Sequence, residues 1–60
     1  MTSERKRELL ALLDGPNGPA RVVRAMAAER YLSAGARADL PALTAAGAPY
    51  NETRITLLWA

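Results

Sequence analysis

The chain contains no cysteine, no histidine and no phenylalanine. Without cysteine it forms no disulfide bond and offers no thiolate to a metal, and without histidine it lacks the commonest general acid or base. Its longest run of apolar residues, at positions 9–13, is far shorter than the ~20 residues of a membrane span. We therefore expect no enzyme activity, no metal or other cofactor, and no membrane contact.

The chain has 60 residues, which is enough for one domain with a small core. Half of the residues are apolar, a fraction typical of globular proteins, and we expect a single helical domain over residues 1–60. So small a core leaves little room to enclose a small-molecule substrate. The formal net charge is only +2, which does not amount to a strong field around the chain. We expect no secretion signal and therefore a cytoplasmic protein. The abundance of alanine and arginine favours a bacterial or phage origin.

The first predicted helix covers residues 3–13. Ser3 is the expected N-cap, and the leucines of the second half supply the buried side. Asp14, Gly15 and Pro16 should end the helix, with Gly15 in a left-handed conformation.

A second helix is predicted from Pro19 to about Ala34, after a turn at residues 15–19. Proline suits the first turn of a helix because its missing N–H needs no partner there. On a helical wheel one side gathers Val22, Val23, Met26 and Ala27. Arg30 falls within this stripe, and we expect its side chain to reach the surface and pair with Asp14 or Asp39.

A short third helix is expected to start at Leu40 or Pro41, capped by Asp39, and to end at Gly47. The fold class is therefore all-α, a compact bundle of three to four short helices.

The last helix is predicted to follow an N-cap at Asn51. Tyr50 and Ile55 have the spacing of a hydrophobic staple, and Ile55, Leu58 and Trp59 form the expected inward stripe. Alternation of Ile55, Leu57 and Trp59 leaves open a β-strand over residues 53–59, which would have to pair with another chain because no second strand is visible.

Residues 39–58 place a short helix, a glycine-containing turn and a second helix in succession. This outline resembles a helix-turn-helix, in which the second helix enters the major groove of DNA. The resemblance implies that Asn51, Thr53 and Arg54 face bases, and that the phosphates are contacted by Arg21, Arg24 and Arg37. The chain departs from the pattern at Thr53 and Thr56, where apolar residues are usual, and Glu52 would repel phosphate.

Protein binding is the other hypothesis. Tryptophan, tyrosine and arginine are the residue types that dominate interface hot spots, and the candidates here are Tyr31, Tyr50, Arg54 and Trp59. Packing in the core is the competing interpretation of each aromatic. We expect a small non-enzymatic protein-interaction or assembly module, with a protein partner or self-association. The alternative is a small DNA-binding regulator that uses residues 39–60.

Overall fold

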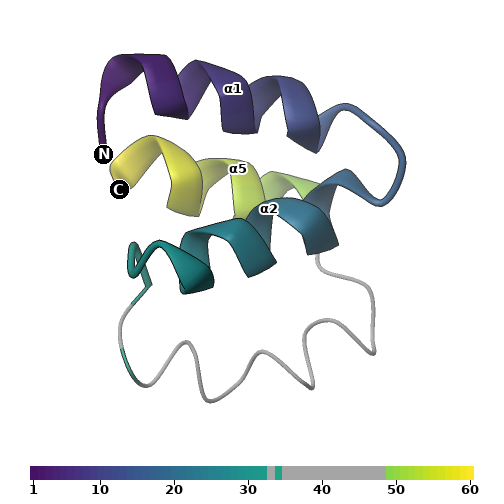
Figure 1. Cartoon of the computed structure of the whole chain (residues 1–60). Coiled ribbons are helices and arrows are strands. Elements are labelled where there is room, and N and C mark those ends of the chain that lie inside the picture. Colours follow the sequence, from purple (N-terminus) through teal and green to yellow (C-terminus); the bar gives the residue numbers. More distant parts are fainter. Residues whose placement is uncertain (33, 35–48) are drawn as a thin grey trace.

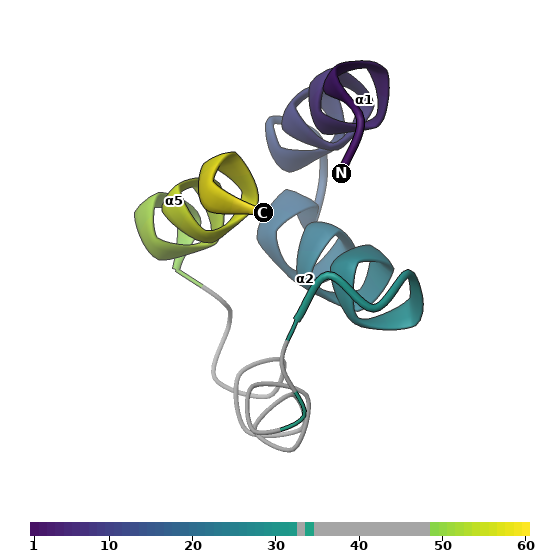
Figure 2. The ribbon, with the colours of Figure 1, turned by 90° about the vertical axis from the view of Figure 1, so that its left-hand side faces the viewer.

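Three helices make up the part of the chain that the computed structural model describes, which is residues 1–32, 34 and 49–60. They are α1 (Ser3–Leu13), α2 (Gly18–Ala28) and α5 (Tyr50–Trp59), and the described residues contain no strand. Each helix packs against the other two, and Figure 2 shows them nearly end-on around a common centre. The all-helical prediction is confirmed for these residues. The third predicted helix, with Asp39 and Gly47, lies outside them.

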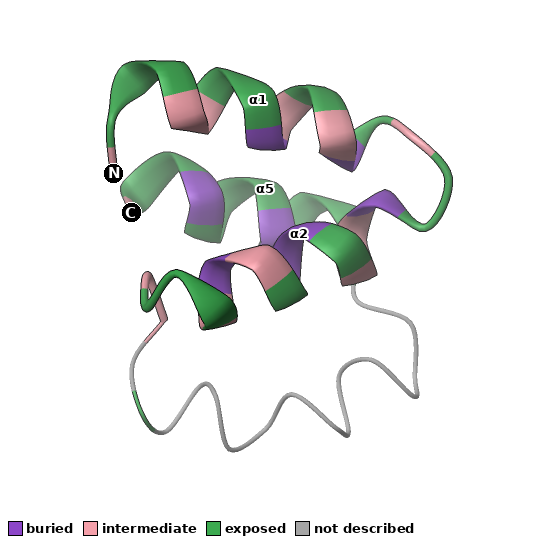
Figure 3. Ribbon diagram, viewed as in Figure 1, coloured by how far each residue is buried: buried purple, intermediate pink, exposed green. Residues whose placement is uncertain are grey.

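Helices α1 and α2 are antiparallel. Helix α5 also runs in the direction opposite to α1, so both chain ends lie at one end of the bundle (Figure 1). The core between the helices is a cluster of five fully buried side chains, which are Leu9, Leu13, Val22, Met26 and Leu57. Figure 3 shows these buried positions turned towards the centre from all three helices. The burial of apolar surface in this cluster is the main force that holds the helices together.

Helix α1 has the predicted bounds but a different N-cap. Thr2, not Ser3, is the capping residue, and its Oγ1 accepts a hydrogen bond from the Arg5 N–H at 3.1 Å. Both residues carry a hydroxyl group, and the extended backbone of Thr2 (φ −71°, ψ 154°) is the conformation that capping requires. The sequence pattern therefore located the helix start correctly and assigned its cap one residue too late.

The turn between α1 and α2 has its left-handed residue at Asn17 (φ 53°) and not at Gly15, where the sequence predicted it. Asparagine adopts this conformation more readily than most residues. Gly18 begins α2 and is needed for another reason. A Cβ at this position would lie 1.9 Å from the Leu13 carbonyl oxygen, so only glycine allows the start of α2 to lie against the end of α1.

Helix α2 buries Val22, Val23 and Met26 as predicted, but it ends at Ala28 and not near Ala34. Arg30 adopts a left-handed conformation with φ of 63°. Its N–H donates to the Ala27 carbonyl at 3.1 Å, while the Tyr31 N–H donates to the Met26 carbonyl at 2.8 Å. These two bonds form a Schellman motif, which ends the helix and returns Tyr31 to the core. Arg30 is therefore exposed beyond the helix and is not part of the apolar stripe.

Arg30→Gly is expected to raise the free energy of unfolding by about 1 kcal/mol. A left-handed conformation costs a residue with a Cβ about 1–2 kcal/mol, and the greater freedom of glycine in the unfolded chain offsets part of that gain. In a domain of this size the change corresponds to a Tm increase of about 4–8 °C in a thermal melt. Arg30→Ala keeps the Cβ and removes the charge, so it should give no increase. A similar increase in both variants would mean that the charge, and not the backbone, is responsible.

Candidate functional site on the outer face of α5

Helix α5 has apolar side chains on two opposite faces. Its inner face buries Thr53 and Leu57, which are 4% and 0% exposed. Its opposite side carries Ile55, Leu58 and Trp59, which are 55%, 40% and 86% exposed, and we call these three residues the outer face of α5. Figure 2 shows this helix with one side turned away from α1 and α2. An exposed apolar group of this kind marks interaction sites in soluble proteins.

The helical conformation of residues 53–59 is confirmed, but the predicted inward stripe of Ile55, Leu58 and Trp59 is wrong. Two stripes were available, because a helix presents residues three and four apart on one face. The stripe with the larger side chains was predicted to be the buried one, but it is exposed in the structure. In the structure Leu57 enters the core between the smaller Thr53 and Ala60, which allow α5 to approach the other helices closely.

Polar contacts join both ends of α5 to α1 and its C-cap. The Tyr50 hydroxyl donates a 2.6 Å hydrogen bond to Asp14 Oδ1, at the end of α1. At the other end, the Lys6 ammonium donates to the Leu58 carbonyl at 3.0 Å, where the negative end of the helix dipole favours a cation. These contacts join residues that are far apart in the sequence. They are formed with Leu57 buried and with the outer face of α5 exposed.

The start of α5 differs from the prediction. Pro49 is the N-cap, and Asn51 lies inside the first turn with its side chain exposed. The buried Thr53 hydroxyl donates to the Pro49 carbonyl at 2.8 Å, so this polar group in the core is satisfied. Tyr50 belongs to the helix and contacts Asp14, and it does not form the predicted staple with Ile55. Its pKa is raised by the hydrogen bond to Asp14, by burial and by the Asp14 charge, against an opposing effect of the Arg54 charge.

The four residues predicted to bind a partner do not form one surface. Trp59 and Arg54 are exposed on α5, while Tyr50 is 42% exposed and its hydroxyl is bonded to Asp14. Tyr31 packs against the core after α2. The structure instead groups Trp59 with Ile55 and Leu58. Their spacing was visible in the sequence, but it was assigned to the core.

The predicted DNA contacts are also divided. Asn51 and Arg54 are exposed near the start of α5, but Thr53 between them is buried and bonded within the helix. Arg21 and Arg24 are exposed on α2. Arg37 lies outside the described residues. Of the three residues predicted to read bases, two therefore present their side chains to the solvent.

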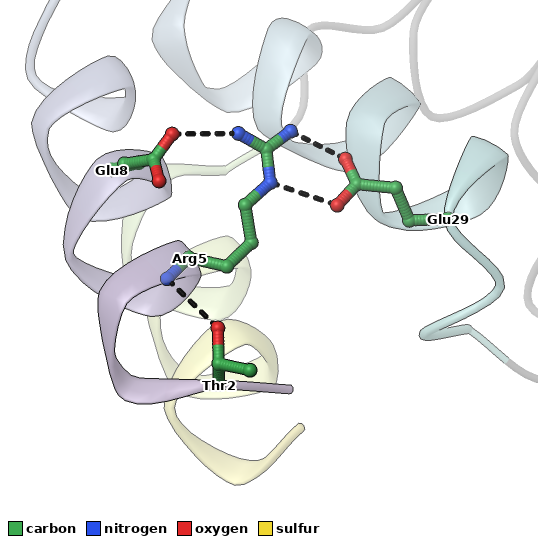
Figure 4. A network of polar contacts seen from close by, with 4 residues as sticks. All are labelled: Thr2, Arg5, Glu8 and Glu29. Carbon is green, nitrogen blue, oxygen red and sulfur yellow. Dashed lines mark hydrogen bonds and ion pairs between the residues drawn. The ribbon is translucent and has the colours of Figure 1, made fainter.

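A second polar feature joins α1 to the end of α2 (Figure 4). Arg5 Nε donates to Glu29 Oε1 at 2.8 Å, a second guanidinium nitrogen contacts the other Glu29 oxygen, and Nη1 contacts Glu8 at 3.2 Å. Two parallel bonds between guanidinium and carboxylate give this pair a defined geometry. The hydrogen bond from Arg5 lowers the pKa of Glu29, despite an opposing effect of burial, while the Glu29 hydrogen bond raises the pKa of Arg5.

The Arg5–Glu29 pair is expected to make stability depend on pH in acid. Because folding lowers the Glu29 pKa, the contribution is fully present above its ordinary value of 4.5 and is lost as the pH falls through the folded-state pKa. Arg5 stays charged throughout. Thermal melts between neutral and acidic pH should show Glu29→Gln to be modestly less stable than the parent at neutral pH, with a difference that vanishes in acid. Glu4→Gln is the control, because it alters an exposed carboxylate outside this pair. It should lose stability in acid to the same extent as the parent.

Among residues 1–32, 34 and 49–60, no group of three or more acidic side chains is placed to hold a metal ion. In the same residues no helix is both long enough and apolar enough to cross a bilayer. No model of a known protein family matches the chain, and no curated protein or solved structure is significantly similar to it.

Proposed function

We propose that this chain is a small non-enzymatic protein-interaction module that binds through the outer face of α5. The observation that carries the proposal is the exposure of Ile55, Leu58 and Trp59 on one side of a helix whose other side is buried. Three large apolar side chains thus lie together on the solvent side of α5, and Trp59 is the most exposed of them at 86%. Covering them with a partner would recover the free energy of burial that the monomer does not use.

The composition of the outer face suits an interface. Tryptophan is the residue type most enriched in hot spots, and Trp59 is almost fully exposed. Ile55, Leu58 and Trp59 have the i, i+3, i+4 spacing with which a helix enters an apolar surface. The neighbouring Arg54 and Glu52 are exposed and of opposite charge. They supply a polar border, which favours specific docking over general adhesion.

A DNA-binding function receives less support from the same helix. A reading helix would present Asn51, Thr53 and Arg54 together, and Thr53 is buried. Insertion of α5 into a groove would also set the uncharged outer face beside the phosphates. Electrophoretic retardation of duplex DNA at low salt, reversed by added salt and by Arg54→Ala, would favour DNA over protein as the partner.

Site-specific photo-crosslinking in the native cells tests the protein-interaction proposal. A photoreactive phenylalanine analogue at position 55 lies within the outer face but leaves Trp59 in place. We expect covalent protein adducts from this position, and their loss when Trp59→Ala is added. The matched control carries the same analogue at position 24, an exposed site on α2. Adducts of equal yield at both positions, or none at position 55, would contradict the proposal, provided that circular dichroism shows both variants folded.

A further inference from the structure

The exposed side of α5 has the spacing of a two-stranded coiled-coil seam. Asn51, Ile55 and Leu58 follow one another at intervals of four and three residues, the alternation of d, a and d positions in a heptad. Isoleucine at a with leucine at d is the combination that favours two parallel strands. In the same phase Thr53, Leu57 and Ala60 fall at f and c, the positions opposite the seam. These three residues face the core of the chain itself.

Two residues flank this seam at positions that meet in a parallel pair. Arg54 is at g and Trp59 is at e, five residues further along the helix. In parallel coiled coils the g residue of one strand lies beside the e residue five positions later in the other. The guanidinium of each Arg54 would then lie on the indole of the other copy, a favourable cation–π arrangement. An antiparallel pair would instead place g beside g, and so Arg54 beside Arg54.

We propose that the partner of the outer face of α5 is a second copy of this chain, paired in parallel along Asn51, Ile55 and Leu58. This inference rests on the proposed function and names its partner. Asn51 is the polar member of the seam, at a d position, and burying its amide there costs stability. The pairing is self-complementary, as a symmetric dimer requires, because Arg54 and Trp59 each meet the other on the opposite copy.

The size of the surface indicates a weak, reversible dimer. The outer face exposes on the order of 400 Å² of apolar surface, with about 150–250 Å² for a fully exposed large side chain. A stable interface of standard size buries about 800 Å² on each partner. A dimer formed through a single helix of 10 residues is therefore expected to be weak and to form only at high protein concentration.

Sedimentation equilibrium of the purified full chain, from about 1 μM to 1 mM, tests the inference over the range of weak complexes. We expect the average mass to rise from monomer towards dimer. Asn51→Leu should tighten the dimer about tenfold or more, because it removes the polar member of the seam. Thr56→Leu adds the same bulk to an exposed position of α5 outside the seam and should leave the affinity unchanged. Equal tightening by both would indicate non-specific adhesion and overturn the inference.

Orientation has its own test, because the chain has no natural cysteine. Parallel pairing places the two copies of position 51 side by side, so Asn51→Cys should oxidise to a disulfide-linked dimer while Arg24→Cys should not. Cross-linking of an Asn51→Cys chain to a Trp59→Cys chain, in preference to Asn51→Cys with itself, would show an antiparallel pair and overturn the proposal.

The proposed function can fail separately. A chain that remains monomeric at 1 mM, on the order of the weakest specific complexes, overturns self-pairing. Adducts from position 55 to a different protein would then leave the interaction module standing with another partner. A chain that neither dimerises nor gives adducts from position 55 would overturn both proposals.

Discussion

Gly18→Ala is expected to destabilise the fold by about 3 kcal/mol or more, although alanine is normally the better helix residue. The added Cβ would lie 1.9 Å from the Leu13 carbonyl oxygen and 2.4 Å from the Leu13 carbonyl carbon. These are backbone atoms, so no side-chain rotation relieves the overlap, and α2 must move away from α1. A domain of this length has a stability of only about 3–9 kcal/mol at typical values per residue. Urea denaturation followed by circular dichroism measures the loss.

Gly15→Ala is the matched control, because it lies in the same turn. A Cβ at Gly15 would have its closest contact, 3.3 Å, with the Leu12 carbonyl oxygen, and the backbone there is not left-handed. Small local adjustment is enough, and the lower entropy of unfolded alanine helps by about 0.4–1 kcal/mol. We expect a nearly neutral change. Comparable losses in the two variants would show that α2 does not depend on a close approach at Gly18.

Leu57→Ala is expected to lower the free energy of unfolding by about 2–5 kcal/mol, enough to leave much of the population unfolded. Leu57 is fully buried and is the only residue of α5 in the fully buried core cluster. Its truncation leaves a cavity where the three helices meet. Thermal and urea unfolding of the variant give the size of the effect.

Leu58→Ala is the comparison that makes this result specific. The residue has the same chemistry and the neighbouring position, but it is 40% exposed on the outer face of α5. We expect a loss of about 1 kcal/mol, smaller than for Leu57→Ala, because part of the Leu58 side chain already lies in solvent and its truncation leaves no enclosed cavity. If Leu58→Ala were the more damaging substitution, α5 would be rotated so that its outer face pointed into the core. The pair therefore tests the feature on which the candidate site depends.

The helical class and the bounds of α1 could be predicted from the sequence, because local signals determine them. A hydroxyl residue, a charged first turn, a run of leucines and a glycine–proline stop all act within a few residues of one another. The buried side of α2 was also predictable, since Val22, Val23 and Met26 form its clear apolar stripe. Its end was not. The prediction extended α2 to about Ala34, and nothing local showed that Arg30 would take the left-handed conformation first.

The candidate site could be predicted only in part. Trp59 was predicted to bind a partner from its residue type, but the helix face to which it belongs was assigned to the core. When a helix has two apolar stripes, the spacing of the residues identifies both but does not show which of them is buried. The decision depends on contacts across the fold, such as Tyr50 with Asp14 and Lys6 with the Leu58 carbonyl. The first contact joins residues that are 36 apart in the sequence, and the second joins residues that are 52 apart. Both separations are beyond the reach of a local pattern.

The exposure of Trp59 also has an optical consequence. It is the only tryptophan of the chain, and its indole is in water in the folded monomer, much as it would be after unfolding. The wavelength of its fluorescence should therefore change little when the monomer melts. Docking onto the outer face of α5 would instead cover the indole and exclude water from it, which shifts its emission to the blue. The one tryptophan thus reports on association while remaining almost silent on folding.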